Sequence, residues 1–130
     1  LLRPKKQSAP FRKKNIPALI ICYNQLSFLK NMVRQLERFT NDIIVVDNCS
    51  TYPPLLEYYE KEFSYTLLRK KENFGHLVYR DELIDRLTGE LYLLTDPDLS
   101  FNDELPHDFI DTFLEISEFF RARRVGFALC

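Results

Sequence analysis

The sequence predicts an α/β domain with a mainly parallel sheet covered by helices on both faces. Two observations carry this prediction. Short apolar runs rich in branched residues alternate along the chain with segments of helical periodicity. These runs are apolar at consecutive positions, which is typical of strands buried on both sides in a parallel sheet. The chain of 130 residues is long enough for one such domain.

The first strand is expected at residues 17–24, because PALIICYN is short and apolar on both faces. A helix should follow, with Ser27 as its cap and an end near Thr40 and Asn41. Its apolar residues recur at the spacing of an amphipathic helix: Phe28, Leu29, Met32, Val33 and Leu36.

The same alternation continues to the end of the chain. A second strand at 42–48 precedes a helix opened by Pro53, since proline is favoured in the first turn of a helix. A third strand is expected at 65–70, and a third helix at 78–87 that turns at Gly89. The remaining elements are a fourth strand at 90–96, a helix at 106–123 and a fifth strand at 125–129.

Charge is unevenly distributed. The first fourteen residues hold six basic residues and no acidic one, which leaves 12 basic against 19 acidic residues, a net charge of −7, in the remainder. We therefore expect residues 1–15 to form a basic arm or linker and residues 16–130 to form the domain. An acidic domain argues against nucleic-acid binding. No apolar run is long enough to span a membrane, so we expect a cytoplasmic protein or one peripheral to a membrane.

Polar residues follow four of the expected strands. Because the carboxyl ends of parallel strands meet at one edge of a sheet, these residues are candidates for a ligand site. The candidates are Tyr23 and Asn24 after the first strand, Asp47, Asn48 and Ser50 after the second, and Asn73, Gly75 and His76 after the third. Arg80 lies in the helix that follows the third strand.

The most informative stretch is LYLLTDPDLS, where Asp96 and Asp98 follow the fourth strand on either side of Pro97. Residues two apart in an extended chain point the same way and lie about 6 to 7 Å apart. Proline favours that extended link. Two carboxylates so placed repel each other, which calls for a cation; Mg²⁺ or Mn²⁺ fits oxygen ligands, and zinc does not fit a chain with only two histidines. The other interpretation is a polar turn that ends the strand.

Two interpretations are also open for Tyr23, for Asp47, for the pair Asn73 and Gly75, and for Arg80. Tyr23 stacks on a nucleobase or packs in the core. Asp47 accepts a hydrogen bond from a base or a ribose, or it caps the next turn. Asn73 and Gly75 form a turn with or without a ligand. Arg80 reaches a diphosphate, or it is a solvated charge beside Asp81.

Four segments in order resemble the nucleotide-binding half of family 2 glycosyltransferases, which have the Rossmann-like GT-A fold: ICYN, IIVVDNCST, ENFGHLVYRDELI and LYLLTDPDL. The resemblance implies a nucleotide-diphosphate sugar donor, with a UDP-sugar favoured, and a divalent metal. By position, the nucleotide-binding residues would be Tyr23, Asn24, Asp47, Asn73, Gly75, Arg80 and Asp96, and the metal ligands Asp96 and Asp98.

The sequence departs from the family pattern in two ways. Cys49 stands where the family often has glycine, and Pro97 is an uncommon middle residue of the Asp-x-Asp motif. The acceptor half, which supplies the general base of the inverting reaction, is expected outside this chain. Two other classes stay open: a non-catalytic nucleotide-sugar-binding module, and a haloacid-dehalogenase-like phosphatase, which shares an Asp-x-Asp motif. The phosphatase class lacks support, because that family needs a lysine downstream of its Asp-x-Asp motif and no lysine follows Asp98.

Overall fold

The structure is a computed structural model that describes residues 16–89 and 91–127. The expected basic arm at 1–15 and the last residues, 128–130, lie outside this description. The described residues belong to two units, one within Lys13–Phe101 and one from Asn102 onward, and each is described by itself.

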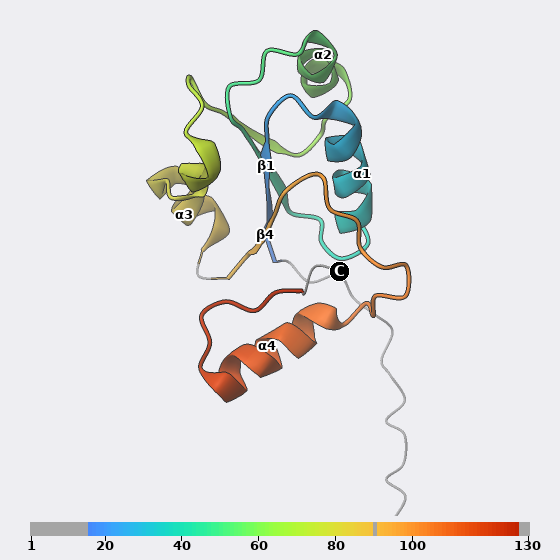
Figure 1. The fold of residues 1–130 in the computed structure, drawn as a ribbon, viewed down its shortest axis with the longest axis vertical. Helices are drawn as coiled ribbons and strands as arrows, with labels where there is room; N and C mark the ends of the chain where they lie inside the picture. The colour runs from blue at the N-terminus through green and yellow to red at the C-terminus, as the bar shows by residue number, and fades with distance from the viewer. Residues whose placement is uncertain (1–15, 90, 128–130) are drawn as a thin grey trace, which may run out of the picture. The chain divides into compact units, whose positions relative to one another are not determined.

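The first unit is built on a parallel sheet of four strands, as the sequence predicts (Figure 1). The strands are β1 (Ala18–Cys22), β2 (Ile43–Asp47), β3 (Thr66–Arg69) and β4 (Leu93–Thr95). Their order in the sheet is β3-β2-β1-β4, so β1 and β2 are central. All pairings are parallel, and Cys22 on β1 lies opposite Asp47 on β2, which in turn lies opposite Arg69 on β3.

Helices cover both faces of this sheet (Figure 1). The helices of this unit are α1 (Leu26–Leu36), α2 (Pro53–Lys61), the 3-10 helix η1 (Gly75–Tyr79) and α3 (Glu82–Thr88). Side chains alternate along β1, so Ile20 packs with residues of α1 and α2, whereas Leu19 packs on the other face with residues of η1 and α3. The continuous apolar runs are thereby explained, because both sides of β1 and β2 are buried.

Three details of the first predicted helix are wrong. The helix ends at Leu36 and not near Thr40 and Asn41, because a turn follows it. The helix begins at Leu26, because the amide of Leu29 already donates to the carbonyl of Gln25 (2.9 Å), so Ser27 lies inside the first turn and is not the cap. Leu26 packs against the core, which accounts for the earlier start. Phe28 lies at the edge of the apolar stripe and is 51% exposed.

The helix predicted at 78–87 is divided in two. Its first residues belong to η1, the backbone leaves helical geometry at Arg80, and α3 starts at Glu82. Asp81 causes the restart, since its side chain accepts a hydrogen bond from the amide of Leu83 and so caps the new helix. Gly89, at φ 66°, ends α3 as expected.

The second unit contains α4 (Phe109–Phe120), which is shorter than the predicted 106–123. Residues 107 and 108 form a turn, and Arg121 ends the helix in the left-handed conformation at φ 51°. The rings of Phe109, Phe113 and Phe127 contact one another. Residues 125–127 of the expected fifth strand are not in a strand, and the rest of it lies outside the described residues. Nowhere in 16–89 or 91–127 is a helix long and apolar enough to cross a bilayer.

Candidate functional site

The loops that follow β1, β2, β3 and β4 define the candidate site, which we call the carboxyl edge: residues 23–24, 48–52, 70–75 and 96–98. In an open parallel sheet this edge is where ligands bind. Two polar side chains connect the first three of these loops, Asn24 after β1 and Asn48 after β2. A third, Asp47 at the end of β2, closes the turn within its own loop.

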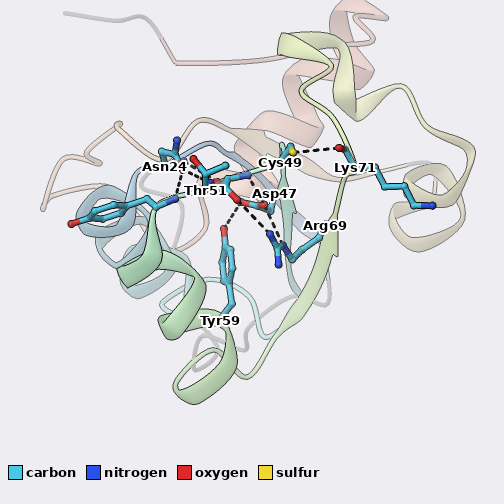
Figure 2. A network of polar contacts seen from close by, with 9 residues as sticks. Asn24, Asp47, Cys49, Thr51, Tyr59, Arg69 and Lys71 are labelled. Carbon is cyan, nitrogen blue, oxygen red and sulfur yellow. Dashed lines mark hydrogen bonds and ion pairs between the residues drawn. The ribbon is translucent and has the colours of Figure 1, made fainter.

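Asp47 is the last residue of β2, and its side chain is fully buried. One carboxylate oxygen accepts a hydrogen bond from the hydroxyl of Tyr59 (3.0 Å), and the other accepts from the amide of Ser50 (3.0 Å). Nε of Arg69 lies 3.5 Å from the second oxygen. Figure 2 shows Tyr59 and Arg69 pointing toward Asp47 from different elements. Asp47 therefore caps the turn after β2, which is one of its two expected roles.

Tyr59 keeps its proton in this cluster. Burial raises the pKa of Tyr59 far above its ordinary value, and the nearby Cys22 and Asp47 raise the pKa further. The pKa of the Cys22 thiol is also raised, chiefly by burial. A protonated phenol is the form that donates a hydrogen bond, as the hydroxyl of Tyr59 does to Asp47.

Asn24 connects the loop after β1 with the start of α2. Its side-chain oxygen accepts hydrogen bonds from the backbone amides of Thr51 (2.8 Å) and Tyr52 (2.9 Å). The backbone amide of Asn24 donates to the hydroxyl of Ser50 (2.9 Å). Asn24 adopts φ 56°, a left-handed conformation that asparagine tolerates better than most residues. The side chain satisfies amides next to the N-terminus of α2 that would otherwise need water.

Asn48 connects the loops after β2 and β3. Its buried side chain donates to the carbonyl of Gly75 (3.0 Å) and accepts from the amide of Phe74 (2.8 Å). Asn73 completes this turn by accepting from the amide of Gly75 (2.8 Å), and Gly75 has φ 64°, which favours glycine. The expected turn at Asn73 and Gly75 is thus present, and Asn48 holds it.

Cys49 occupies the position at which the family often has glycine, and it keeps a glycine-like backbone with φ 67°. Its thiol donates to the carbonyl of Lys71 (3.4 Å), which adds a further contact between the loops after β2 and β3 (Figure 2). A non-glycine residue in this conformation costs about 1 to 2 kcal/mol. The loop therefore retains the glycine-like conformation at the expense of strain.

The other candidates are exposed on the same edge or near it. Tyr23 is 47% exposed, so it is not a core tyrosine. Arg80 is exposed at the end of η1, with its guanidinium over the ring of Tyr79 (5.8 Å). Asp96 and Asp98 are exposed on either side of the buried Pro97.

The link between the two aspartates differs from the expected extended one. β4 ends at Thr95, and Pro97 and Asp98 form a turn. Proline is compatible with either conformation, because its ring fixes φ near −65° and both an extended link and a turn accept that value. Burial of the proline ring still leaves both carboxylates facing solvent.

The donor set of Asp96 and Asp98 fits a magnesium-type ion better than a metal whose ligands are all protein side chains. No group of three or more His, Cys, Asp or Glu side chains that could hold a metal occurs in the part of the chain described. Magnesium commonly uses one or two carboxylates and takes its other ligands from water and substrate phosphates. Two exposed carboxylates are the donor set that such a site needs.

Two residues of the site were not among the predicted candidates: Tyr59 and Arg69. Arg69 is the last residue of β3, but its relation to Asp47 depends on strand register. Tyr59 looks like one more apolar position of α2 in the sequence, and only the fold shows that its hydroxyl meets Asp47.

Comparison with known proteins gives one finding. The family model described as "Glycosyl transferase family 2" matches residues 18–119. No curated protein and no solved structure matches the chain significantly.

Proposed function

Since the chain belongs to glycosyl transferase family 2, we propose that it binds a nucleotide-diphosphate sugar, with uridine as the nucleoside, at the carboxyl edge. The sugar is then transferred to an acceptor hydroxyl. The observation that supports this function is that the side chains at and near the carboxyl edge form two sets, one buried and one exposed. Buried polar groups hold the loops, while an aromatic ring, a guanidinium and two carboxylates stay exposed: Tyr23, Arg80, Asp96 and Asp98.

The strand order supports one orientation of the donor. Tyr23 follows β1, so its exposed ring is the surface on which the base stacks. Asp96 and Asp98 follow the neighbouring β4 and hold Mg²⁺ or Mn²⁺ beside the diphosphate, with Asp98 the more direct ligand. Arg80 approaches the nucleotide from the end of η1.

The reaction proposed is an inverting displacement. The acceptor hydroxyl attacks the anomeric carbon, its proton passes to a carboxylate base, and the nucleoside diphosphate leaves. When bound, the divalent metal supplies Lewis-acid stabilisation of the charge on the diphosphate. The residues assigned here act by binding and orientation: Tyr23 fixes the base, and the aspartates fix the diphosphate end.

Calorimetric titration of the chain with uridine diphosphate, with and without Mn²⁺, tests the proposal. Wild type should bind only when the metal is present. The Asp98→Ala variant should lose at least tenfold in affinity, which corresponds to about 1.4 kcal/mol, because an exposed ligand is removed. The variant should keep the wild-type circular dichroism spectrum.

Asp103→Ala is the matched control, because it removes another exposed aspartate a few residues further along. Its affinity should equal that of wild type. The metal-site assignment fails if Asp98→Ala binds as well as wild type does with Mn²⁺. The whole proposal fails if wild type binds none of uridine, guanosine and thymidine diphosphates.

A further inference from the structure

Three aromatic side chains on the loops of the carboxyl edge are about half-exposed, and the proposed function uses one of them. Tyr23 follows β1 (47% exposed), Tyr52 precedes α2 (45%) and Phe74 precedes η1 (53%). Tyr23 is the proposed stacking surface for the base. A flat base has a second face, and every face of a base can stack on an aromatic ring. The exposed rings of Tyr52 and Phe74 are the candidates to cover that second face.

The backbone around Phe74 is held by hydrogen bonds of the protein itself. The buried side chain of Asn48 accepts from the amide of Phe74 (2.8 Å) and donates to the carbonyl of Gly75 (3.0 Å). The side chain of Asn73 accepts from the amide of Gly75 (2.8 Å). The main chain that carries the Phe74 ring is therefore ordered before a ligand arrives, so binding has to restrict only the rotation of the side chain.

Asn48 also connects this loop to the end of β1. Its backbone amide donates to the carbonyl of Cys22 (2.8 Å), the residue that precedes Tyr23. One residue, Asn48, thus contacts the backbone beside Tyr23 through its own main chain and the backbone of Phe74 through its side chain. Tyr23 and Phe74 therefore start from opposite sides of Asn48.

Tyr52 starts from the same side as Tyr23. The amide of Tyr52 donates to the side chain of Asn24 (2.9 Å), and Asn24 is the residue that follows Tyr23. A ring on this side extends the surface next to Tyr23 and does not face it. Of the two candidates, Phe74 is the one placed across from Tyr23.

The spacing of the strands fits a base between these two rings. Tyr23 follows β1 and Phe74 follows β3, with β2 between them. Two strand intervals correspond to about 9 to 10 Å. A base in van der Waals contact with a ring on each face needs about 7 to 8 Å between the rings. Two aromatic side chains can close this difference, and the base then lies over the end of β2.

We infer that Phe74 stacks on the face of the base opposite to Tyr23, so that the base is held between two rings. This inference rests on the proposed function. A phenylalanine has no polar group, so its ring contributes by covering the base and leaves the edge of the base free for hydrogen bonds to other residues. The diphosphate then extends past β1 toward Asp96 and Asp98, which follow β4.

Calorimetric titration with uridine diphosphate and Mn²⁺ tests this stacking. Phe74→Ala should weaken binding by about fivefold to a hundredfold, the usual effect of removing a ring on which a base stacks. Phe74→Tyr should bind as wild type does, because it keeps the ring. Titration with pyrophosphate and Mn²⁺ separates the two ends of the ligand, and Phe74→Ala should bind pyrophosphate as wild type does.

Leu77→Ala is the matched control. Leu77 belongs to η1, directly after Phe74 and Gly75 in the same segment, and is 46% exposed. The variant removes a similarly exposed apolar side chain without removing a ring. It should leave the affinities for uridine diphosphate and pyrophosphate unchanged.

Phe74→Trp provides a direct signal of stacking, because the chain contains no tryptophan. Fluorescence of the indole should fall when uridine diphosphate binds in the presence of Mn²⁺, since a stacked base quenches it. Pyrophosphate with the same Mn²⁺ should leave the emission unchanged, which controls for quenching by the metal. Leu77→Trp should respond to neither ligand, which controls for light absorbed by the nucleotide.

Three results would overturn the inference alone while wild type still binds uridine diphosphate. The first is a Phe74→Ala variant with wild-type affinity. The second is an equal loss of affinity in Phe74→Ala and Leu77→Ala, which would indicate a general disturbance of η1. The third is a Phe74→Trp variant that binds uridine diphosphate without a change in emission. If wild type binds neither uridine diphosphate nor pyrophosphate, the proposed function and this inference fail together.

Discussion

Tyr23 is the single residue at which exposure has the most direct functional meaning. Tyr23 immediately follows β1, whose residues are almost entirely buried, yet Tyr23 itself is 47% exposed. A half-exposed aromatic ring gains only part of the energy of full burial, and stacking on a base would cover its exposed part. The ring is therefore the simplest part of the proposed site to test.

Tyr23→Ala should weaken binding of uridine diphosphate by about tenfold or more, because stacking on one base contributes about 1 to 3 kcal/mol. Its free energy of unfolding should change little. Phe28→Ala is the control, since it removes a similarly exposed ring (51%) from α1. Equal affinities of the two variants would exclude stacking on Tyr23.

At the scale of elements, α3 depends on one acidic residue. Asp81 caps the helix through the amide of Leu83 and also pairs with Lys70, which follows β3. The hydrogen bond from Lys70, followed by that from Leu83, lowers the pKa of Asp81 below its ordinary value of 3.8. Ionised Asp81 thus connects α3 to the end of β3.

The lowered pKa of Asp81 predicts a dependence of stability on acid pH. A carboxyl whose pKa is lower in the folded state stabilises the fold above its unfolded pKa, and this contribution is lost as the pH falls below 3.8 through the folded pKa. Wild type should therefore lose stability relative to Asp81→Asn over that range, because asparagine keeps the cap without the charge. Thermal melts from pH 7 to about pH 2, which extend below 3.8 toward the lowered pKa, measure the difference.

Asp85→Asn, an exposed residue on the same helix, is the control for removing one negative charge from α3. A constant difference in melting temperature between wild type and Asp81→Asn at every pH would contradict the assignment.

The sequence already contained the signal for the cap, an aspartate before a short apolar segment. The continuous helix was predicted at 78–87 because the apolar periodicity runs through both pieces.

For the sheet as a whole, stability is concentrated in the two central strands. Ile20 on β1 is fully buried between the sheet and the layer formed by α1 and α2. Ile20→Ala should lower the free energy of unfolding by about 2 to 5 kcal/mol, through lost burial and the cavity left behind. Because domains are stable by only about 5 to 15 kcal/mol, this variant should unfold at a much lower urea concentration.

Leu94→Ala is the matched control on the outer strand β4, where the side chain is 46% exposed. It should change the free energy of unfolding by about 0.5 kcal/mol or less. Urea titrations followed by circular dichroism provide both values. If the two substitutions were equally costly, the central strands would not be the main source of stability.

The sequence was sufficient for the architecture because burial on both faces makes each central strand a continuous apolar run, and that signal is local. It also located the polar residues that follow the strands, because strand ends are visible as the points where apolar runs stop, but it did not identify Tyr59 or Arg69 as part of the site. The contacts among these residues could not be predicted from the sequence. The bond between Asn48 and Phe74 joins loops 26 positions apart, and the contact of Asp47 with Tyr59 requires α2 to be packed on the sheet.

The hydrogen bonds of Asn24, Asp47 and Asn48 also bear on the thermodynamics of binding. They hold the amides of Ser50, Thr51, Tyr52 and Phe74, so these loops are ordered by side chains at or just beyond the ends of β1 and β2. A ligand that binds a flexible loop must compensate for the entropy lost when the loop becomes ordered. At this edge that entropy is already lost when the protein folds, so more of the contact energy remains available as affinity.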